Sequence, residues 1–321
     1  MNPIEFWQNF KLGEEQEIAC NFIYDGLLNL HNLKTLGNET EIFPFLYYIS
    51  VGIERLLKVA VILLEFNDST DVDSFEKSLI THNHIDLLNR IKNKRLLAFG
   101  DVHVALLSLL STFYKTHRYD RFSLQSLTSY SKDKKAFHEF LYKYLKIDIK
   151  DESSISPVEN SLQIKKFIGK TVRKITRELY TVIKETASSK NLYTEEISSS
   201  SSKAGKILFG EDPIIFENED IATVEALIFL MSTKESSLID FMKSVEPLQL
   251  DPGLDSEYLQ ALLHKRPEEM QGIIDEVEAC YDDIGNPKDR LGMIKAIKNP
   301  GITFGDIDES GSDKEGGINN L

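Results

Sequence analysis

The stretch Phe45–Phe66, FLYYISVGIERLLKVAVILLEF, is the most informative about the fold. Its apolar residues recur at helical spacing along one stripe, and further apolar residues fill most of the remaining circumference. A helix that is apolar nearly all round is buried at the centre of a domain. We therefore predict a central helix that begins at Pro44. Its interior charges are Glu54, Arg55 and Lys58, and the first and last of these are four residues apart in the order that favours an ion pair.

The same periodicity extends to both sides of this stretch and predicts a mainly α protein. Between Lys206–Phe209 and Ile214–Phe216 the turn residues Gly, Glu, Asp and Pro occur in sequence, which predicts one β-hairpin. The expected helices of the N-terminal part cover 14–36, 45–66, 74–80, 85–97, 101–112, 131–145 and 157–188. Those of the C-terminal part cover 220–232, 237–245, 256–264, 267–283 and 287–297.

Five consecutive serines, Ser198–Ser202, mark the clearest domain boundary. We expect a helical bundle over 1–192, a Ser-rich linker over 193–205 and a small, acidic, mostly helical domain over 206–298. Residues 299–321 are rich in Gly, Asp and Ser, and this composition is typical of a disordered tail.

The net charge of −14 is distributed unevenly along the 321 residues. Residues 1–200 carry 26 Lys and Arg against 26 Asp and Glu, whereas 201–321 carry 11 against 25. Within the first part, 115–190 is basic, with 17 cations against nine acidic residues. The basic middle therefore either binds an anion, such as nucleic acid, or receives the acidic end of the same chain.

The helix expected over 157–188 presents five cations on one face. At 100° per residue, these side chains lie within about 80° of one another, opposite an apolar stripe. Such a basic stripe can follow a nucleic-acid backbone, dock the acidic domain, or simply form a solvated outer face. The cations of this basic stripe are Lys166, Lys170, Arg173, Arg177 and Lys184.

The segment HRYDRF combines cations and aromatic rings. Its residues are His117, Arg118, Tyr119, Asp120, Arg121 and Phe122. Arginine can bind phosphate through two parallel hydrogen bonds, aromatic rings can stack on bases, and histidine titrates near neutral pH. The structural alternative is that the arginines pair with nearby carboxylates while the rings attach a loop to the core.

Three pieces of 42–124 together resemble a HEPN domain, a helical-bundle module of toxin–antitoxin, abortive-infection and antiviral-defence systems. The first is GIERLLK, which contains Glu54 and Lys58, and the second is HNHIDLL, which begins at His82. The third is the Arg-Tyr element of HRYDRF. The resemblance implies a homodimer and, in active members, metal-independent RNA cleavage by an Arg followed by a His after four to six residues.

No arginine of this sequence has a histidine at that distance, so a ribonuclease would need an atypical site. For it we assign Arg118, Tyr119, Arg121 and His117, with His117 or His84 transferring the proton and the arginines stabilising the phosphate. We expect a bacterial defence or toxin–antitoxin protein that binds RNA through the basic surface. The alternative is a non-catalytic dimeric adaptor whose acidic C-terminal domain recruits or regulates a partner.

Other kinds of site have little support in the sequence. Cys20 and Cys280 are the only cysteines, which excludes a disulfide scaffold and a cysteine-based zinc cluster. The motif His82-Asn83-His84-Ile85-Asp86 fits no zinc spacing and suits the start of a helix better. We expect no metal and no cofactor. Without a signal peptide or a membrane-spanning run, we expect a cytoplasmic protein.

Overall fold

The computed structural model divides the chain into two units, Met1–Glu217 and Asn218–Leu321. Its regular elements are helical throughout the part of the chain that it describes, apart from an isolated bridge between Thr35 and Glu159. The mainly α class is thus confirmed. None of the described helices is long and apolar enough to cross a membrane. The described residues are 3–67, 69–117, 132–147, 158–192, 202–210, 215–233, 236–299, 301, 302 and 304.

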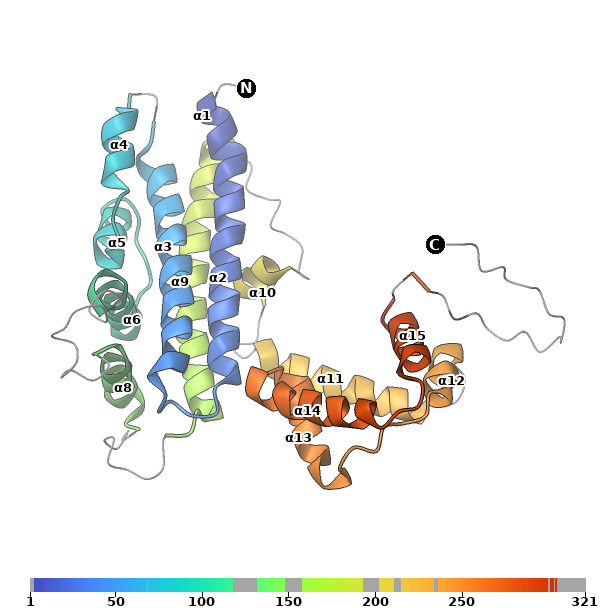
Figure 1. Ribbon diagram of the computed structural model, residues 1–321. Helices are drawn as coiled ribbons and strands as arrows, with labels where there is room; N and C mark the ends of the chain where they lie inside the picture. Colours follow the sequence, from blue (N-terminus) through green and yellow to red (C-terminus); the bar gives the residue numbers. More distant parts are fainter. Residues whose placement is uncertain are drawn as a thin grey trace. The chain divides into compact units, whose positions relative to one another are not determined.

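The first unit is a bundle built around three long helices, which Figure 1 shows side by side. The helices α2, α3 and α9 form this centre, shorter helices cover one side of α3, and α10 packs on α2 and α9. The elements are α1 (Pro3–Phe6), η1 (Trp7–Lys11), α2 (Leu12–Asn32), α3 (Glu39–Glu65), α4 (Val72–Ser78), α5 (His84–Lys92), α6 (Asp101–Thr112), η2 (Phe113–His117), α8 (Lys132–Leu145), α9 (Leu162–Ser189) and α10 (Lys203–Phe209).

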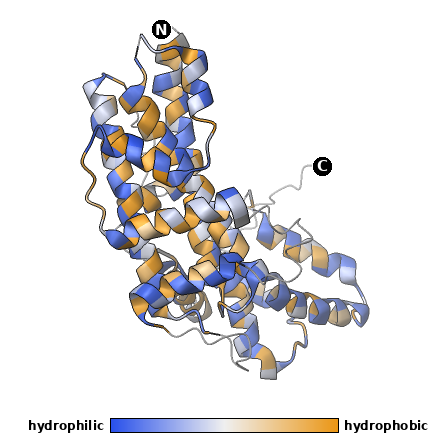
Figure 2. Cartoon of the chain, turned by 90° about the vertical axis from the view of Figure 1, so that its left-hand side faces the viewer, coloured by the Kyte–Doolittle hydropathy of each residue, from blue (hydrophilic) through white to orange (hydrophobic). Residues whose placement is uncertain are grey.

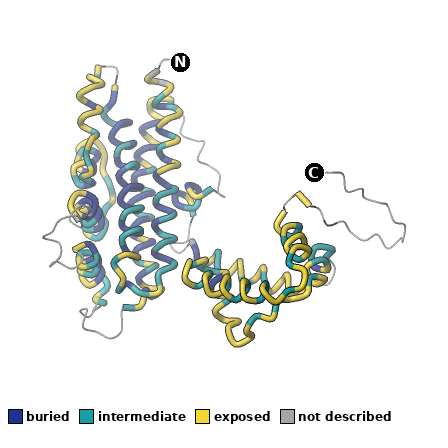
Figure 3. The backbone as a smooth tube through the Cα atoms, in the orientation of Figure 1, coloured by how far each residue is buried: buried dark blue, intermediate teal, exposed yellow. Residues whose placement is uncertain are grey.

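Helix α3 is the buried central helix that its composition predicts. It begins at Glu39 rather than at Pro44, because the Asn38 side chain caps it by accepting a hydrogen bond from the Thr40 N–H at 3.0 Å. Figure 3 shows buried backbone along α2, α3 and α9. In Figure 2, the helices facing the viewer mix hydrophobic and hydrophilic residues, the pattern of helices with one side buried. Because α3 is buried within its own unit, its apolar surface gives no argument for a homodimer, which stays a prediction.

A glycine allows α2 and α3 to approach closely. A Cβ atom added to Gly52 would lie 2.5 Å from Ile23 Cγ1 and 2.7 Å from the Ala19 carbonyl oxygen. Both distances are shorter than van der Waals contact, and the carbonyl belongs to the α2 backbone. The glycine of the GIERLLK motif therefore serves helix packing.

The predicted β-hairpin is wrong, since its first strand is helical. Lys206–Phe209 belongs to α10, whose first turn is capped by the Ser202 hydroxyl, which accepts a hydrogen bond from the Gly205 N–H at 2.9 Å. Ile215 and Phe216, from the expected second strand, open another helix, α11 (Ile215–Ser232). The spacing of Ala204, Ile207 and Leu208, three and four residues apart, is a helical one, and all three side chains are buried. Because α10 packs in the first unit, the units divide at Glu217 and not within 193–205.

The second unit contains the helices expected for the C-terminal part, but little core. Among its described residues, Ile239 and Ala261 are the buried hydrophobic ones. Most of its backbone is exposed or intermediate in Figure 3. Besides α11, which enters it from the first unit, its elements are α12 (Ser237–Ser244), η5 (Pro252–Leu254), α13 (Asp255–His264), α14 (Pro267–Asp282) and α15 (Pro287–Lys298).

Candidate functional site

A carboxylate near the middle of α3 organises the candidate site. Glu54 is only 6% exposed, and its Oε1 lies 2.6 Å from Lys58 Nζ, so the ion pair expected from the sequence is present. Its other oxygen, Oε2, lies 3.0 Å from Nδ1 of His82, in the segment between α4 and α5. A buried carboxylate requires such partners, since desolvating an unpaired charge is costly. Glu54 thus holds a lysine and a histidine in fixed positions.

His82 is the accessible member of this group. Its side chain is 47% exposed, compared with 8% for the Glu54 side chain and 24% for that of Lys58. A proton on Nδ1 donates to the Glu54 carboxylate, which leaves Nε2 as the basic nitrogen of the neutral ring. The ring also packs edge-to-face on Tyr114, with the centroids 4.7 Å apart. Two contacts therefore orient the imidazole while part of it faces solvent.

His84, which the sequence analysis considered as an assisting base, is fully buried. Its Nε2 donates to the Ser50 carbonyl oxygen at 2.9 Å, which fixes the ring against α3. Burial lowers the pKa of this imidazole, although the bond to Ser50 opposes the shift. A neutral, inaccessible ring supports the fold and cannot reach a substrate, so His82 replaces His84 as the candidate base.

The end of α6 contacts the segment that carries His82. The Ser111 hydroxyl donates to Asn83 Oδ1 at 3.0 Å, and Asn83 caps α5. After α6 the chain continues as the π-helical turn η2, which carries Tyr114 and ends at His117. Turns of this kind often occur at functional sites.

The remaining catalytic assignments from the sequence cannot be placed here. The structure places the backbone of His117 at the end of η2, but its side chain lies outside the described parts, as do Arg118, Tyr119 and Arg121. His117, with which HRYDRF begins, follows Tyr114 by three residues on η2.

Two of the three pieces that resemble a HEPN domain therefore meet, and the turn that precedes the third piece contacts them. Glu54 and Lys58 come from the first, His82 and Asn83 from the second, and the chain leading into the third supplies Tyr114. Chemically, this group offers an accessible base oriented by a carboxylate, with a lysine beside it. Such a group can transfer a proton during attack on an electrophile such as phosphorus. In the sequence, the only indication of a functional role for His82 was its position at the start of HNHIDLL.

The motif His82-Asn83-His84-Ile85-Asp86 does not converge on a common centre. His82 faces Glu54, His84 faces Ser50, and Asp86 accepts a hydrogen bond from the Asn83 side chain. These partners support the helix-start interpretation of the motif and not a metal site.

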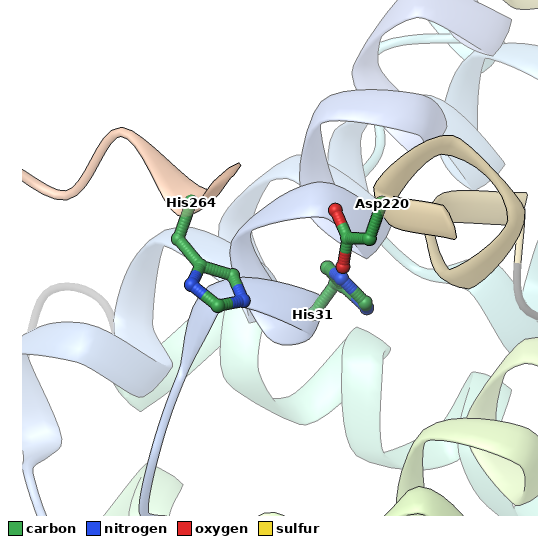
Figure 4. A group of neighbouring side chains, drawn as sticks. All are labelled: His31, Asp220 and His264. Carbon is green, nitrogen blue, oxygen red and sulfur yellow. The ribbon is translucent and has the colours of Figure 1, made fainter. Parts of the chain in front are cut away.

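Figure 4 shows three further side chains of types that can ligate a metal ion, His31, Asp220 and His264. His31 belongs to the first unit, and the other two belong to the second. Because a metal site needs ligands held at set distances, we derive no site from residues of two separate units.

The basic stripe of α9 has the expected apolar counterpart. The opposite face is buried, through Ile164, Ile168, Val172, Ile175, Leu179 and Val182. On the basic side Lys166, Lys170 and Lys184 are exposed, whereas Arg173 and Arg177 are half-buried. The five cations therefore do not form a uniform exposed surface.

Arg177 is engaged by the chain's own backbone. Its guanidinium donates to the carbonyl oxygens of Leu208, Phe209 and Gly210, at 3.2, 3.1 and 2.6 Å. These carbonyls end α10, where the helix dipole is negative and backbone acceptors lack helical partners. Part of the stripe thus docks a helix C-terminus of the first unit.

A groove of about 810 Å³ lies beside this contact, between α9 and α10. Tyr180 and Phe209 pack edge-to-face on one side, with their ring centroids 5.4 Å apart. Lys184 and Glu185 also line it, so its charge is mixed. We assign the groove no ligand.

Compared with known protein families, characterised proteins and solved structures, the chain matches none. The geometry of the Glu54 site and of the basic stripe therefore carries the functional argument.

Proposed function

We propose that this chain is an RNA-directed, HEPN-like protein of a defence or toxin–antitoxin system, with the Glu54–His82 pair as its reactive centre. The observation that supports the proposal is the contact between the first two motif pieces, which gives an accessible imidazole oriented by a carboxylate. The resemblance adds RNA as the substrate class and a homodimer as the assembly. The histidine comes from the segment before α5, not from a position separated from an arginine by four to six intervening residues.

In the proposed reaction, His82 Nε2 accepts the proton of an RNA 2′-hydroxyl as its oxygen attacks the adjacent phosphorus. The bond from phosphorus to the 5′-oxygen breaks, and that oxygen takes up a proton from water or an acid. The products are a 2′,3′-cyclic phosphate and a free 5′-hydroxyl. Glu54 stabilises the imidazolium, and the cations of HRYDRF stabilise the phosphate, in roles that general acid–base and electrostatic catalysis require.

The test uses the full chain, single-stranded RNA and EDTA. We expect cleavage that leaves 2′,3′-cyclic phosphate ends, and a loss of about 100-fold or more in His82→Gln, since a general base contributes about 10²–10⁴-fold. His264→Gln, the same change in the second unit, is the matched control and should leave the rate unchanged. Equal rates for His82→Gln and the unchanged chain would place the chemistry elsewhere. Absence of cleavage by the unchanged chain would refute the catalytic part of the proposal.

RNA binding is tested separately from cleavage. The three exposed cations of the stripe, Lys166, Lys170 and Lys184, can each contact phosphate without disturbing α10. Their joint change to Glu should weaken RNA binding and lower its salt dependence, because each lost phosphate contact removes released counterions. A truncated chain that tests competition by the acidic unit must end at Glu217, since ending at Leu192 would also remove α10. If the triple Glu variant binds RNA as tightly as the unchanged chain, the stripe is a solvated outer face that does not bind RNA.

A second candidate function is that of an adaptor, and the second unit favours it. From Asn218 onward, nine Lys and Arg oppose 22 Asp and Glu, a balance of −13. An acidic unit with so little buried core is suited to binding another molecule.

A further inference from the structure

Helix α11 has a composition that does not fit its exposure. Between Ile221 and Met231 its only charged residue is Glu225, and apolar residues occur on every side. Yet Ile228 is 55% exposed, Phe229 65% and Met231 84%. A helix that is hydrophobic all round is normally buried. The run is about half the length needed to span a bilayer.

The rest of the second unit covers this helix only in part. Among its described elements the closest packing is between α13 and α14, and on α11 Val224 and Leu227 are half-buried. Further large hydrophobic residues of the unit are also exposed, namely Met242, Leu254, Leu259, Leu262, Ile274, Leu291, Met293 and Ile302. Large apolar side chains left exposed in such number are typical of an interaction site. Since Ile239 and Ala261 are the buried hydrophobic residues among those described in this unit, the unit gains little free energy from burying its own apolar surface.

The net charge of the second unit indicates which kind of partner can cover α11. A second copy of this surface would bring together two units that each carry −13. The apolar run is instead preceded by acidic residues on its own helix, Glu219 and Asp220, and contains Glu225. A partner that is apolar on one face and basic on the other satisfies both features, because its cations meet carboxylates while its apolar face covers α11.

We propose that α11 is the docking site for a basic amphipathic helix of another protein. The apolar side chains from Ile221 to Met231 would cover the apolar face of that helix, with Phe229 at the centre of the contact. Glu225, which lies within the apolar run, would pair with a lysine or arginine of the partner. This inference develops the adaptor function and does not depend on RNA chemistry.

The experiment measures binding of two fluorescein-labelled 14-residue peptides to the full chain. One peptide contains Leu and Lys in an amphipathic pattern, and the other contains Leu and Glu in the same pattern. We expect the Lys peptide to bind at least about tenfold more tightly than the Glu peptide. We also expect slower hydrogen exchange in α11 when the Lys peptide is bound. Equal affinity for both peptides, or no binding of either, would overturn the proposal.

Two variants locate the contact. Phe229→Glu should weaken binding of the Lys peptide by about tenfold or more, as loss of a central aromatic anchor does. Phe6→Glu, the matched change at a 49% exposed phenylalanine of the first unit, should leave the affinity unchanged. Equal losses in both variants would overturn the placement on α11.

Sedimentation equilibrium tests the competing possibility that a second copy of this chain covers α11. If the full chain is a dimer that Phe229→Glu converts to a monomer, a second copy covers α11 and the proposed occupant is wrong. The RNA assay on Phe229→Glu separates the two functions. Unchanged RNA cleavage with lost peptide binding supports the docking site independently of the reactive centre.

Discussion

Replacing Arg177 by alanine should release α10 from the bundle. The change removes the guanidinium that donates to the carbonyl oxygens of Leu208, Phe209 and Gly210. It also removes a cation from the negative end of the α10 dipole. The helix has only seven residues, so it depends on packing and capping for its stability.

The expected loss of stability follows from these contacts. A hydrogen bond to a charged group contributes about 1.5–3 kcal/mol when well shielded from water. Arg177 is half-buried, and a single guanidinium nitrogen serves two of the three carbonyls, so we expect a total loss of about 2 kcal/mol in the free energy of unfolding. For a domain of this size, that loss corresponds to a decrease of about 4–8 °C in Tm.

Thermal denaturation followed by circular dichroism measures the global effect, and hydrogen exchange of 203–209 measures the local one. Lys170→Ala is the control, because Lys170 is an exposed cation on the same face of α9. Arg177→Lys should recover only part of the loss, since an ammonium lacks the planar fork that reaches three carbonyls. If Arg177→Ala and Lys170→Ala had equal Tm values and equal exchange in α10, the docking role of Arg177 would be refuted.

Three further predictions concern the packing, the cysteines and the buried histidine. Gly52→Ala should destabilise the protein by about 1–3 kcal/mol in urea unfolding through overpacking, whereas Gly13→Ala, whose Cβ meets nothing within 4 Å, should cost nothing. Burial, reinforced by a nearby glutamate, raises the pKa of the Cys20 thiol to about 12, so a thiol reagent should label Cys280 in the native protein and Cys20 only after unfolding. Because the pKa of His84 is lowered in the folded state, its contribution to stability is complete above the unfolded pKa of about 6.5 and is lost as pH falls below it. His84→Gln should therefore reduce the slope of unfolding free energy against pH between 7 and 5 by at most about 1.4 kcal/mol per unit, and an unchanged slope would contradict this assignment.

The sequence predicted the helices because their signals are local. The apolar periodicity of α3 and α9 persists over many residues, so burial of one face required no knowledge of the neighbours. The prediction of a hairpin was wrong because Lys206–Phe209 is short, and short apolar runs fit strands and helices equally well. The preceding Ser202 was assigned to a linker, although a serine at that position can also cap a helix.

The candidate site was only partly predictable for a different reason. The pairing of Glu54 with Lys58 lies within one helix turn, and spacing alone indicates it. His82 lies 28 residues from Glu54, and the choice between His82 and His84 depends on which ring points outward. A one-dimensional pattern cannot give that orientation, because it follows from how α5 packs on α3. Likewise, five cations on one face did not reveal that Arg177 holds α10.

The two units differ in what their folds require. The first unit buries its long helices and has a net charge of only −1, so its own packing holds the Glu54 site in place. The second unit leaves α11 exposed and carries nearly all of the protein's net charge. Helix α11 begins in the first unit, where Phe216 is buried and its ring centroid lies 4.9 Å from that of Tyr24. A partner that orders α11 would therefore stabilise a helix whose first turn is already anchored in the bundle, which reduces the entropy cost of binding at that end.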